Sequence, residues 1–209
     1  RMIKLKELLE LRNMVYSESI KPKHEKKMNQ KLTIWDENLV LPKRIPPEND
    51  SKETLGEVKY LADIKPNAEV VKAGDDVKEN FLPLIEKHNL MVSKNRLSKI
   101  IKQSTKFIME LKYHYNRPRP YQVAQFYGMD LNGTELDSMK TPSFPSGHAV
   151  QGYLIGEYLA KVDPTHSNEY RQVGEDIAQS RLVAKAHYPS DKAYGKELAK
   201  FLVNSMKKI

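Results

Sequence analysis

Apolar side chains recur at helical spacing along most of the chain, with charged residues between them. The clearest pattern follows Ser93 and keeps one apolar face over about six turns as far as Tyr115, before Pro118 and Pro120 end it. Similar patterns predict further helices over 2–20, 51–64, 75–89, 145–161, 167–186 and after Ser190. The sequence therefore predicts an all-α fold of one domain, a helical bundle.

Two stretches lack a helical pattern. Residues 21–50 carry four prolines and Trp35, and are predicted to run extended over the surface. Residues 121–144 contain Gly128 and an Asn-Gly pair, which predicts a long loop with at most one short helix. We expect residues 1–38 to form a basic N-terminal helix and linker, and residues 39–209 to form the helical domain.

Composition narrows the class of protein. With 39% hydrophobic and 30% charged residues, the 209-residue chain is typical of a water-soluble globular protein. No run approaches the roughly 18 apolar residues of a membrane-spanning helix. The absence of cysteine excludes disulfides, thiolate catalysis and Cys-ligated zinc. The first residues also lack the apolar centre of a secretory signal peptide.

The net charge of +8 is concentrated at the N-terminus. Residues 1–31 hold nine Lys/Arg and four Glu. A basic arm of this kind can bind nucleic acid or another anionic surface. No aromatic residue lies among residues 21–31 to stack on bases, so a solvated helix with a charged linker is the favoured interpretation, and nucleic acid is the less favoured partner.

Three groups of residues with chemical potential lie near the ends of the predicted helices. Six residues separate Lys112 from Arg119-Pro120, and these cations taken alone are typical of a helix C-terminus. Pro145-Ser146-Gly147-His148 opens a helix, where unpaired amides can bind an anion. Five residues separate Ser180-Arg181 from His187, and three residues separate His187 from Asp191. An Asp four positions after a His can accept a hydrogen bond from one ring nitrogen, although a first-turn acid also favours the helix dipole.

Together these residues supply what phosphoryl transfer needs without a metal. Three cations can neutralise the charge that spreads over the equatorial oxygens of the phosphoryl group. Arginine suits this purpose because its planar fork donates two parallel hydrogen bonds to phosphate. One neutral histidine can attack, and a protonated histidine can donate to the leaving oxygen.

The same eleven residues, with their spacings, resemble the three-part motif of the type 2 phosphatidic acid phosphatase superfamily. The 24 residues between Pro120 and Pro145, and the 31 between His148 and Ser180, are similar to the family's gaps. Eleven fixed identities in order form a specific signal. Within the superfamily the chain looks like the soluble bacterial class A non-specific acid phosphatases, over residues 39–200. The prolines around 42–47 strengthen that resemblance, and residues 1–38 have no counterpart in it.

The resemblance implies a role for each motif residue. His187 would be the nucleophile that forms a phosphohistidine, Asp191 would orient it, and His148 would be the acid and then the base. The expected phosphate-binding residues are Lys112, Arg119, Ser146, Gly147 and Arg181. The family fold is an all-α bundle and needs no metal or other cofactor, while vanadate can bind as a phosphate mimic. The four other histidines (His24, His88, His114 and His166) are expected to be surface or packing residues, and Tyr121 to line the substrate pocket or pack in the core.

The leading function is hydrolysis of small phosphate monoesters of broad specificity, with phosphotransfer to alcohols as a further activity. The same site could also serve a vanadium-dependent haloperoxidase, although such enzymes are usually much longer. A third alternative is a structural or binding module that uses the basic arm. The resemblance implies a homo-oligomer and a periplasmic location, whereas the absence of a visible signal peptide favours the cytoplasm, so the compartment stays open.

Overall fold

The computed structural model describes residues 4–207, which form α-helices and two 3-10 turns and, within that range, no β-strand. This confirms the all-α prediction. The elements are α1 (Leu5–Arg12), α2 (Pro22–Met28), α3 (Lys52–Asp63), α4 (Ala68–Ala73), α5 (Val77–Lys87), α6 (Lys94–Tyr115), α7 (Pro120–Phe126), η1 (Asp137–Met139), α8 (Gly147–Val162), η2 (Pro164–His166), α9 (Ser167–Val183) and α10 (Pro189–Asn204).

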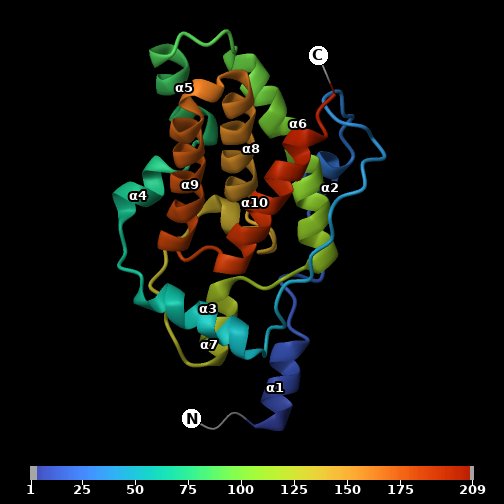
Figure 1. Ribbon diagram of the computed structural model, residues 1–209. Helices are drawn as coiled ribbons and strands as arrows, with labels where there is room; N and C mark the ends of the chain where they lie inside the picture. The colour runs from blue at the N-terminus through green and yellow to red at the C-terminus, as the bar shows by residue number, and fades with distance from the viewer. Residues whose placement is uncertain (1–3, 208–209) are drawn as a thin grey trace.

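Helix α8 lies at the centre of the molecule, in contact with α5, α6, α9 and α10 (Figure 1). Its inward residues, such as Val150, Leu154 and Ile155, are fully buried. The main core is made mostly of apolar side chains from these five helices, among them Leu97 and Leu198. Since each helix has one apolar face, packing them around α8 removes those faces from water.

Helices α8 and α9 approach closely because glycine occupies both sides of their contact. A Cβ atom added at Gly174 would lie 2.8 Å from the backbone oxygen of Gly152, which is too near for any side chain. Glycine therefore lets the two backbones pack directly. This contact fixes the end of α9 relative to the start of α8, and both ends carry predicted site residues.

Helix starts follow the sequence signals closely. The side chains of Ser51, Asp76, Ser93 and Ser146 each accept a hydrogen bond from a backbone N–H in the first turn of α3, α5, α6 and α8. These caps satisfy amides that have no partner within the helix. They confirm the predicted starts of α3, α5 and α6. Helix α8 begins at Gly147 rather than at Pro145 because Ser146 is its cap.

The N-terminal region differs most from the prediction. A single helix over 2–20 is wrong for its described part, since α1 ends at Arg12 and a second helix, α2, occupies part of the expected linker. Leu5 and Leu9, which suggested the apolar face of the long helix, are exposed, and only Leu11 of α1 is buried. Pro22 begins α2, where its fixed φ angle favours a first helical residue. Residues 2 and 3 of the predicted helix lie outside the described residues.

Smaller differences affect other segments. Helix α4, capped by Asn67, was not predicted, and α7 is the short helix expected within residues 121–144. Helix α9 ends at Val183 rather than at residue 186, because the chain turns at Lys185 with a positive φ of 58°. Helix α10 begins at Pro189, with Tyr188 rather than Ser190 in the cap position.

The end of the N-terminal region, residues 1–38, packs into the main core. Trp35 is fully buried, lies edge-on to Phe107, and donates from its indole Nε1 to the carbonyl of Leu202 at 2.8 Å. Leu32 and Ile34 belong to the same cluster. The division of the chain at residue 38 stays a prediction. The structure adds that Leu32, Ile34 and Trp35 belong to the core of the bundle. Among residues 4–207, no helix is long and apolar enough to cross a membrane.

Candidate active site

A pocket of about 370 Å³ opens at one end of the bundle. There α6 and α9 end and α8 and α10 begin, next to α3 and α7 (Figure 1). Four predicted site residues line this pocket: Lys112, Gly147, His148 and His187. Segments separated by up to 75 residues in the sequence thus meet around one cavity, as the three-part motif required.

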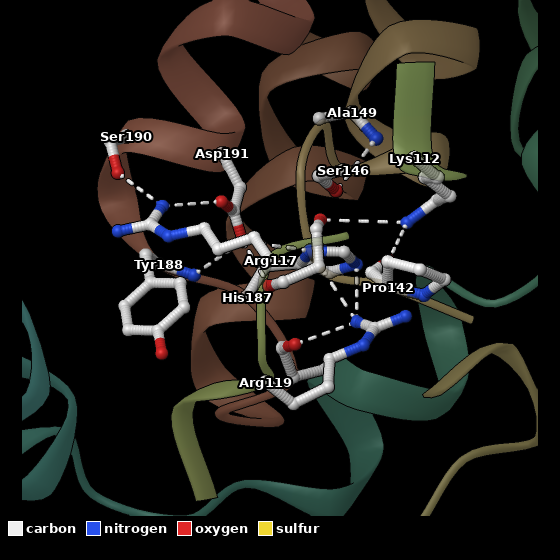
Figure 2. Close-up of polar contacts among 12 residues, drawn as sticks. Lys112, Arg117, Arg119, Pro142, Ser146, Ala149, His187, Tyr188, Ser190 and Asp191 are labelled. Atoms are coloured by element: carbon white, nitrogen blue, oxygen red, sulfur yellow. Dashed lines mark hydrogen bonds and ion pairs between the residues drawn. The ribbon is translucent and has the colours of Figure 1, made fainter. Parts of the chain in front are cut away.

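His187 is held by hydrogen bonds at both ring nitrogens. Its Nδ1 lies 3.2 Å from Oδ2 of Asp191, and Nη1 of Arg119 lies 2.9 Å from its Nε2 (Figure 2). Because a guanidinium can only donate, Nε2 carries the lone pair and Nδ1 carries the proton. The ring is therefore fixed in the tautomer whose Nε2 can attack an electrophile.

Asp191 is buried, and both of its carboxylate oxygens accept hydrogen bonds. Its Oδ2 accepts hydrogen bonds from the backbone N–H of Tyr188 and the hydroxyl of Ser143, besides His187. Its Oδ1 accepts from Nη1 of Arg117 at 2.7 Å. Burial alone would raise the pKa of this carboxyl, but the charge of Arg117 and the bonds from His187 and Ser143 lower it below its usual range. Asp191 therefore stays ionised and can orient the imidazole.

Arg117 links this carboxylate to a second one. Its Nη2 lies 3.1 Å from Oε2 of Glu57 on α3, and its guanidinium lies 3.8 Å from the centre of the Tyr188 ring. Glu57 also accepts hydrogen bonds from the backbone and hydroxyl of Ser190. A buried network thus joins α3 to the first turn of α10, which carries Asp191. This network fixes the position of the short loop between α9 and α10 that carries His187.

Arg119 is fully buried and uses all its donors. Besides His187, it donates to the carbonyls of Ala186, Thr141 and Ser138 and to the hydroxyl of Thr141, at 2.7–3.2 Å. Burial lowers its pKa to about 10, so the side chain is still a cation at neutral pH. A guanidinium so constrained presents its charge to His187 at a fixed position.

Lys112 and the start of α8 form another part of the pocket wall. The Lys112 ammonium donates to the carbonyl of Pro142 at 2.5 Å, and burial, followed by the charge of Arg119, lowers its pKa well below the usual value. A Cβ atom added at Gly147 would lie 3.9 Å from Cε of Lys112. Ser146 is the N-cap of α8 and its oxygen accepts from the N–H of Ala149. The amides that open α8 thus lie next to a cation.

His148 and Arg181 both contact Asp75, which precedes α5. The Nε2 of His148 lies 3.0 Å from the carbonyl oxygen of Asp75, which can only accept, so this nitrogen carries a proton. Nη1 of Arg181 lies 3.1 Å from the Asp75 carboxylate. Burial and the charge of Arg181 lower the pKa of His148 to about 4, while burial lowers the pKa of Arg181. Arg181 is thus linked to His148 through Asp75, but it does not itself line the pocket.

Sequence reasoning missed several contributors. Arg117 lies inside the Lys112–Arg119 spacing, and Arg117-Pro118, the first of two Arg-Pro pairs, predicts only a helix end. Asp75 was read as a helix start, and Glu57 gave no signal. His24 packs against Tyr113, as a packing residue should, but it also lines the pocket. Tyr121 lines a neighbouring cavity and is 39% exposed.

One group of metal-ligand residues occurs in the described part of the chain, at the other end of α9. The ligand atoms of His88, His166 and Glu169 lie within 4.8 Å of one another. The two imidazoles are stacked on each other with their planes 14° apart, and Glu169 is already paired with Lys87 and with His88. These contacts account for the group without an ion, and it lies about 25 Å of helix away from the pocket.

Comparison with known proteins places the chain in a family. Residues 97–203, which are 107 of the 209 residues, match the PAP2 superfamily. The chain belongs to this superfamily, and all eleven motif residues lie within the matched range.

Similar curated proteins are bacterial phosphatases. The chain is 32% identical over 82 residues to the non-specific acid phosphatase of Providencia stuartii, which covers 38% of this chain and 32% of that protein. It is 31% identical over 80 residues to that of Salmonella typhimurium, with 38% and 32% covered. It is 30% identical over 103 residues to an acid phosphatase of Zymomonas mobilis, with 46% and 36% covered. The matched region thus spans about a third of these relatives.

Proposed function

We propose that this chain hydrolyses small phosphate monoesters through a phosphohistidine at His187. The observation that carries the proposal is the state of Nε2 of His187, which holds a lone pair inside a pocket shared with Lys112, Gly147 and His148. Burial and the charge of Arg119 hold the pKa of His187 well below its usual range, so the ring is neutral and nucleophilic.

In the first step, Arg119 releases Nε2 of His187 and donates to a phosphoryl oxygen instead, so that the lone pair of Nε2 attacks the phosphorus while the bond to the ester oxygen breaks. Lys112 and the amide of Gly147 stabilise the equatorial oxygens from the pocket wall, Arg181 adds its positive charge from outside the pocket, and Ser146 caps the helix that presents that amide. As Nε2 becomes bonded to phosphorus, the imidazole gains positive charge, which the ionised Asp191 stabilises through Nδ1–H.

His148 supplies the proton for the leaving oxygen. Once protonated it has two N–H groups, of which one is donated to the carbonyl of Asp75 and the other is available to the ester oxygen. The alcohol then departs, and the neutral His148 takes a proton from a water that attacks the phosphorus. The P–N bond breaks and inorganic phosphate leaves, which restores His187. An alcohol in place of that water would give phosphotransfer.

The proposal uses no metal, because the three cations supply the charge that a metal would provide. Activity should therefore persist after dialysis against EDTA. Vanadate, which resembles phosphate in the transition state, should bind in the same pocket. The homo-oligomer and the compartment that the resemblance implies stay predictions.

A His187→Ala variant tests the proposed nucleophile. Turnover of 4-nitrophenyl phosphate should fall by about 10³-fold or more, while the circular dichroism spectrum and thermal midpoint stay close to those of the wild type. His114→Ala, which changes an exposed histidine on α6, should retain full activity. Near-normal turnover by the folded His187→Ala protein would contradict the assignment of His187 as the nucleophile.

A further inference from the structure

Helix α2 forms one wall of the candidate active-site pocket. Three of its side chains, Lys23, His24 and Lys27, line the cavity together with residues of α6, α8 and the segment at η1. Lys23 and Lys27 are four positions apart and therefore lie on the same face of this helix. No residue of the eleven-residue motif predicted this contribution.

Contacts on both sides of α2 fix its position. Before it, the backbone N–H of Tyr16 donates to the carbonyl of Asn116 at 2.9 Å. Within it, His24 Nδ1 lies 2.6 Å from the hydroxyl of Tyr113 on α6. At its last residue, Lys106 donates to the carbonyl of Met28 at 2.5 Å, and after it the buried Trp35 anchors the chain. These contacts hold α2 along α6 next to the pocket.

The two lysines on this wall form no close ion pair. Within residues 4–207, no salt bridge includes the ammonium of Lys23 or Lys27, both of which are exposed. Asp137, which also lines the pocket, pairs with Lys140 and interacts with Lys23 over a longer distance. The charges of Lys27, Lys23 and Lys21, after burial, lower the pKa of His24, which shows how closely they gather around it. Two ammonium groups thus face a cavity that already contains Lys112.

A single phosphate group needs only the cations at the base of the pocket. Lys112 lines the pocket together with His187, and Arg119 donates to Nε2 of His187, where the reacting phosphorus would lie. The ammonium groups on α2 come from a separate wall, so they can neutralise an anion that belongs to the rest of the substrate. Exposed lysines attract such a group with modest energy per contact, but two of them on one face act together.

We propose that Lys23 and Lys27 form a second anion subsite, which selects substrates that carry a further phosphate group besides the one to be removed. The proposal rests on the proposed function and refines it, since it names the substrate class as small bisphosphorylated molecules. The basic arm, for which the sequence suggested nucleic acid as a less favoured partner, thus takes part in substrate binding.

A matched pair of substrates tests the subsite, namely 1,3-propanediol bisphosphate and 1,3-propanediol monophosphate, at constant ionic strength. The wild type should prefer the bisphosphate in kcat/KM. In the Lys23→Gln/Lys27→Gln variant that preference should fall about tenfold, with the monophosphate affected less than about twofold. The control Lys26→Gln/Lys31→Gln removes the same charge from exposed positions that do not line the pocket, and should keep the preference.

An unchanged preference in the Lys23/Lys27 variant would overturn the subsite, and so would an equal loss in the control, which would indicate general attraction of anions. Should none of these proteins turn over either compound, the proposed function fails by itself. Isothermal titration calorimetry on the same proteins then decides the subsite: tighter binding of the bisphosphate that disappears only in the Lys23/Lys27 variant supports it, and equal binding of both compounds contradicts it.

Discussion

Nη1 of Arg117 lies 2.7 Å from Oδ1 of Asp191, and both side chains are almost completely buried. The other oxygen of this carboxylate faces His187, so one carboxylate connects a structural cation to the candidate nucleophile. The second contact of Arg117, to Glu57, extends the same network to α3. The order of the pocket therefore depends on a residue that lies outside it.

Arg117→Met should destabilise the protein strongly. The substitution would leave Asp191 and Glu57 buried without their cation, and loss of one partner from a buried ion pair costs about 3–5 kcal/mol. Urea unfolding followed by circular dichroism measures this. The control Arg171→Met removes an exposed partner of Glu157 and should cost less than about 1 kcal/mol. A loss below about 1 kcal/mol for Arg117→Met as well would mean that the network does not hold the site.

The pH dependence of catalysis should be set by His148. As the proposed acid, it must be protonated, so activity falls as the pH rises through its pKa, which burial and Arg181 lower to about 4. Because kcat/KM reports the pKa values of the free enzyme, its alkaline limb should lie near that value. A bound phosphate dianion favours protonated His148, so the limb of kcat should lie at higher pH.

Asp75→Asn should move the alkaline limb of kcat/KM to lower pH. The carboxylate of Asp75 raises the pKa of His148, and its removal leaves the opposing charge of Arg181 unbalanced. Initial rates with 4-nitrophenyl phosphate, stopped in alkali at each pH, give the profile for both proteins. Asp176→Asn, at an exposed position on α9, should leave the profile unchanged. A shift to higher pH in Asp75→Asn would contradict the assignment of His148.

Orthovanadate should inhibit competitively, and Lys112→Met should weaken that inhibition. A charge-assisted hydrogen bond contributes about 1.5–3 kcal/mol, which corresponds to about 10-fold to 150-fold in the inhibition constant. The matched variant Lys99→Met changes an exposed lysine of the same helix, and orthovanadate should inhibit it with the wild-type inhibition constant. If both variants retained the wild-type constant, Lys112 would not hold the anion.

Trp35→Ala should show that the end of the arm is part of the folded core. Removal of a fully buried aromatic side chain costs about 3–5 kcal/mol, and the carbonyl of Leu202 would lose its donor. Chemical unfolding again gives the difference. Tyr60→Ala, at a residue that is 48% exposed, should change stability by about 0.5 kcal/mol or less. A similarly small effect of Trp35→Ala would mean that the arm is dispensable.

The sequence predicted best what local chemistry decides. The capping side chains of Ser51, Asp76 and Ser93 act within four residues of their own position, so they could be read directly. The long apolar face of α6 was equally clear because its spacing repeats. The motif also indicated which residues meet around His187, and the pocket gathers Lys112, Gly147 and His148 with it.

Contacts between distant segments decided the rest. Leu5 and Leu9 have the spacing of a buried face but nothing in the described structure covers them, so the pattern overstated the first helix. The role of Arg117 depends on Glu57 and Asp191, which lie 60 and 74 residues away in the sequence. The place of α2 beside the pocket likewise depends on its packing against α6, which no local pattern encodes.

Covalent labelling at His187 tests the central claim most directly. The wild-type protein is mixed with a ³²P-labelled phosphate monoester, quenched in alkali within milliseconds to preserve phosphohistidine, digested and analysed by mass spectrometry. We predict phosphate on the peptide that contains His187, at a level that disappears in His187→Ala and rises when hydrolysis of the intermediate is slowed. Rapid turnover with no phosphate on that histidine, or with the label on another residue, would contradict the account.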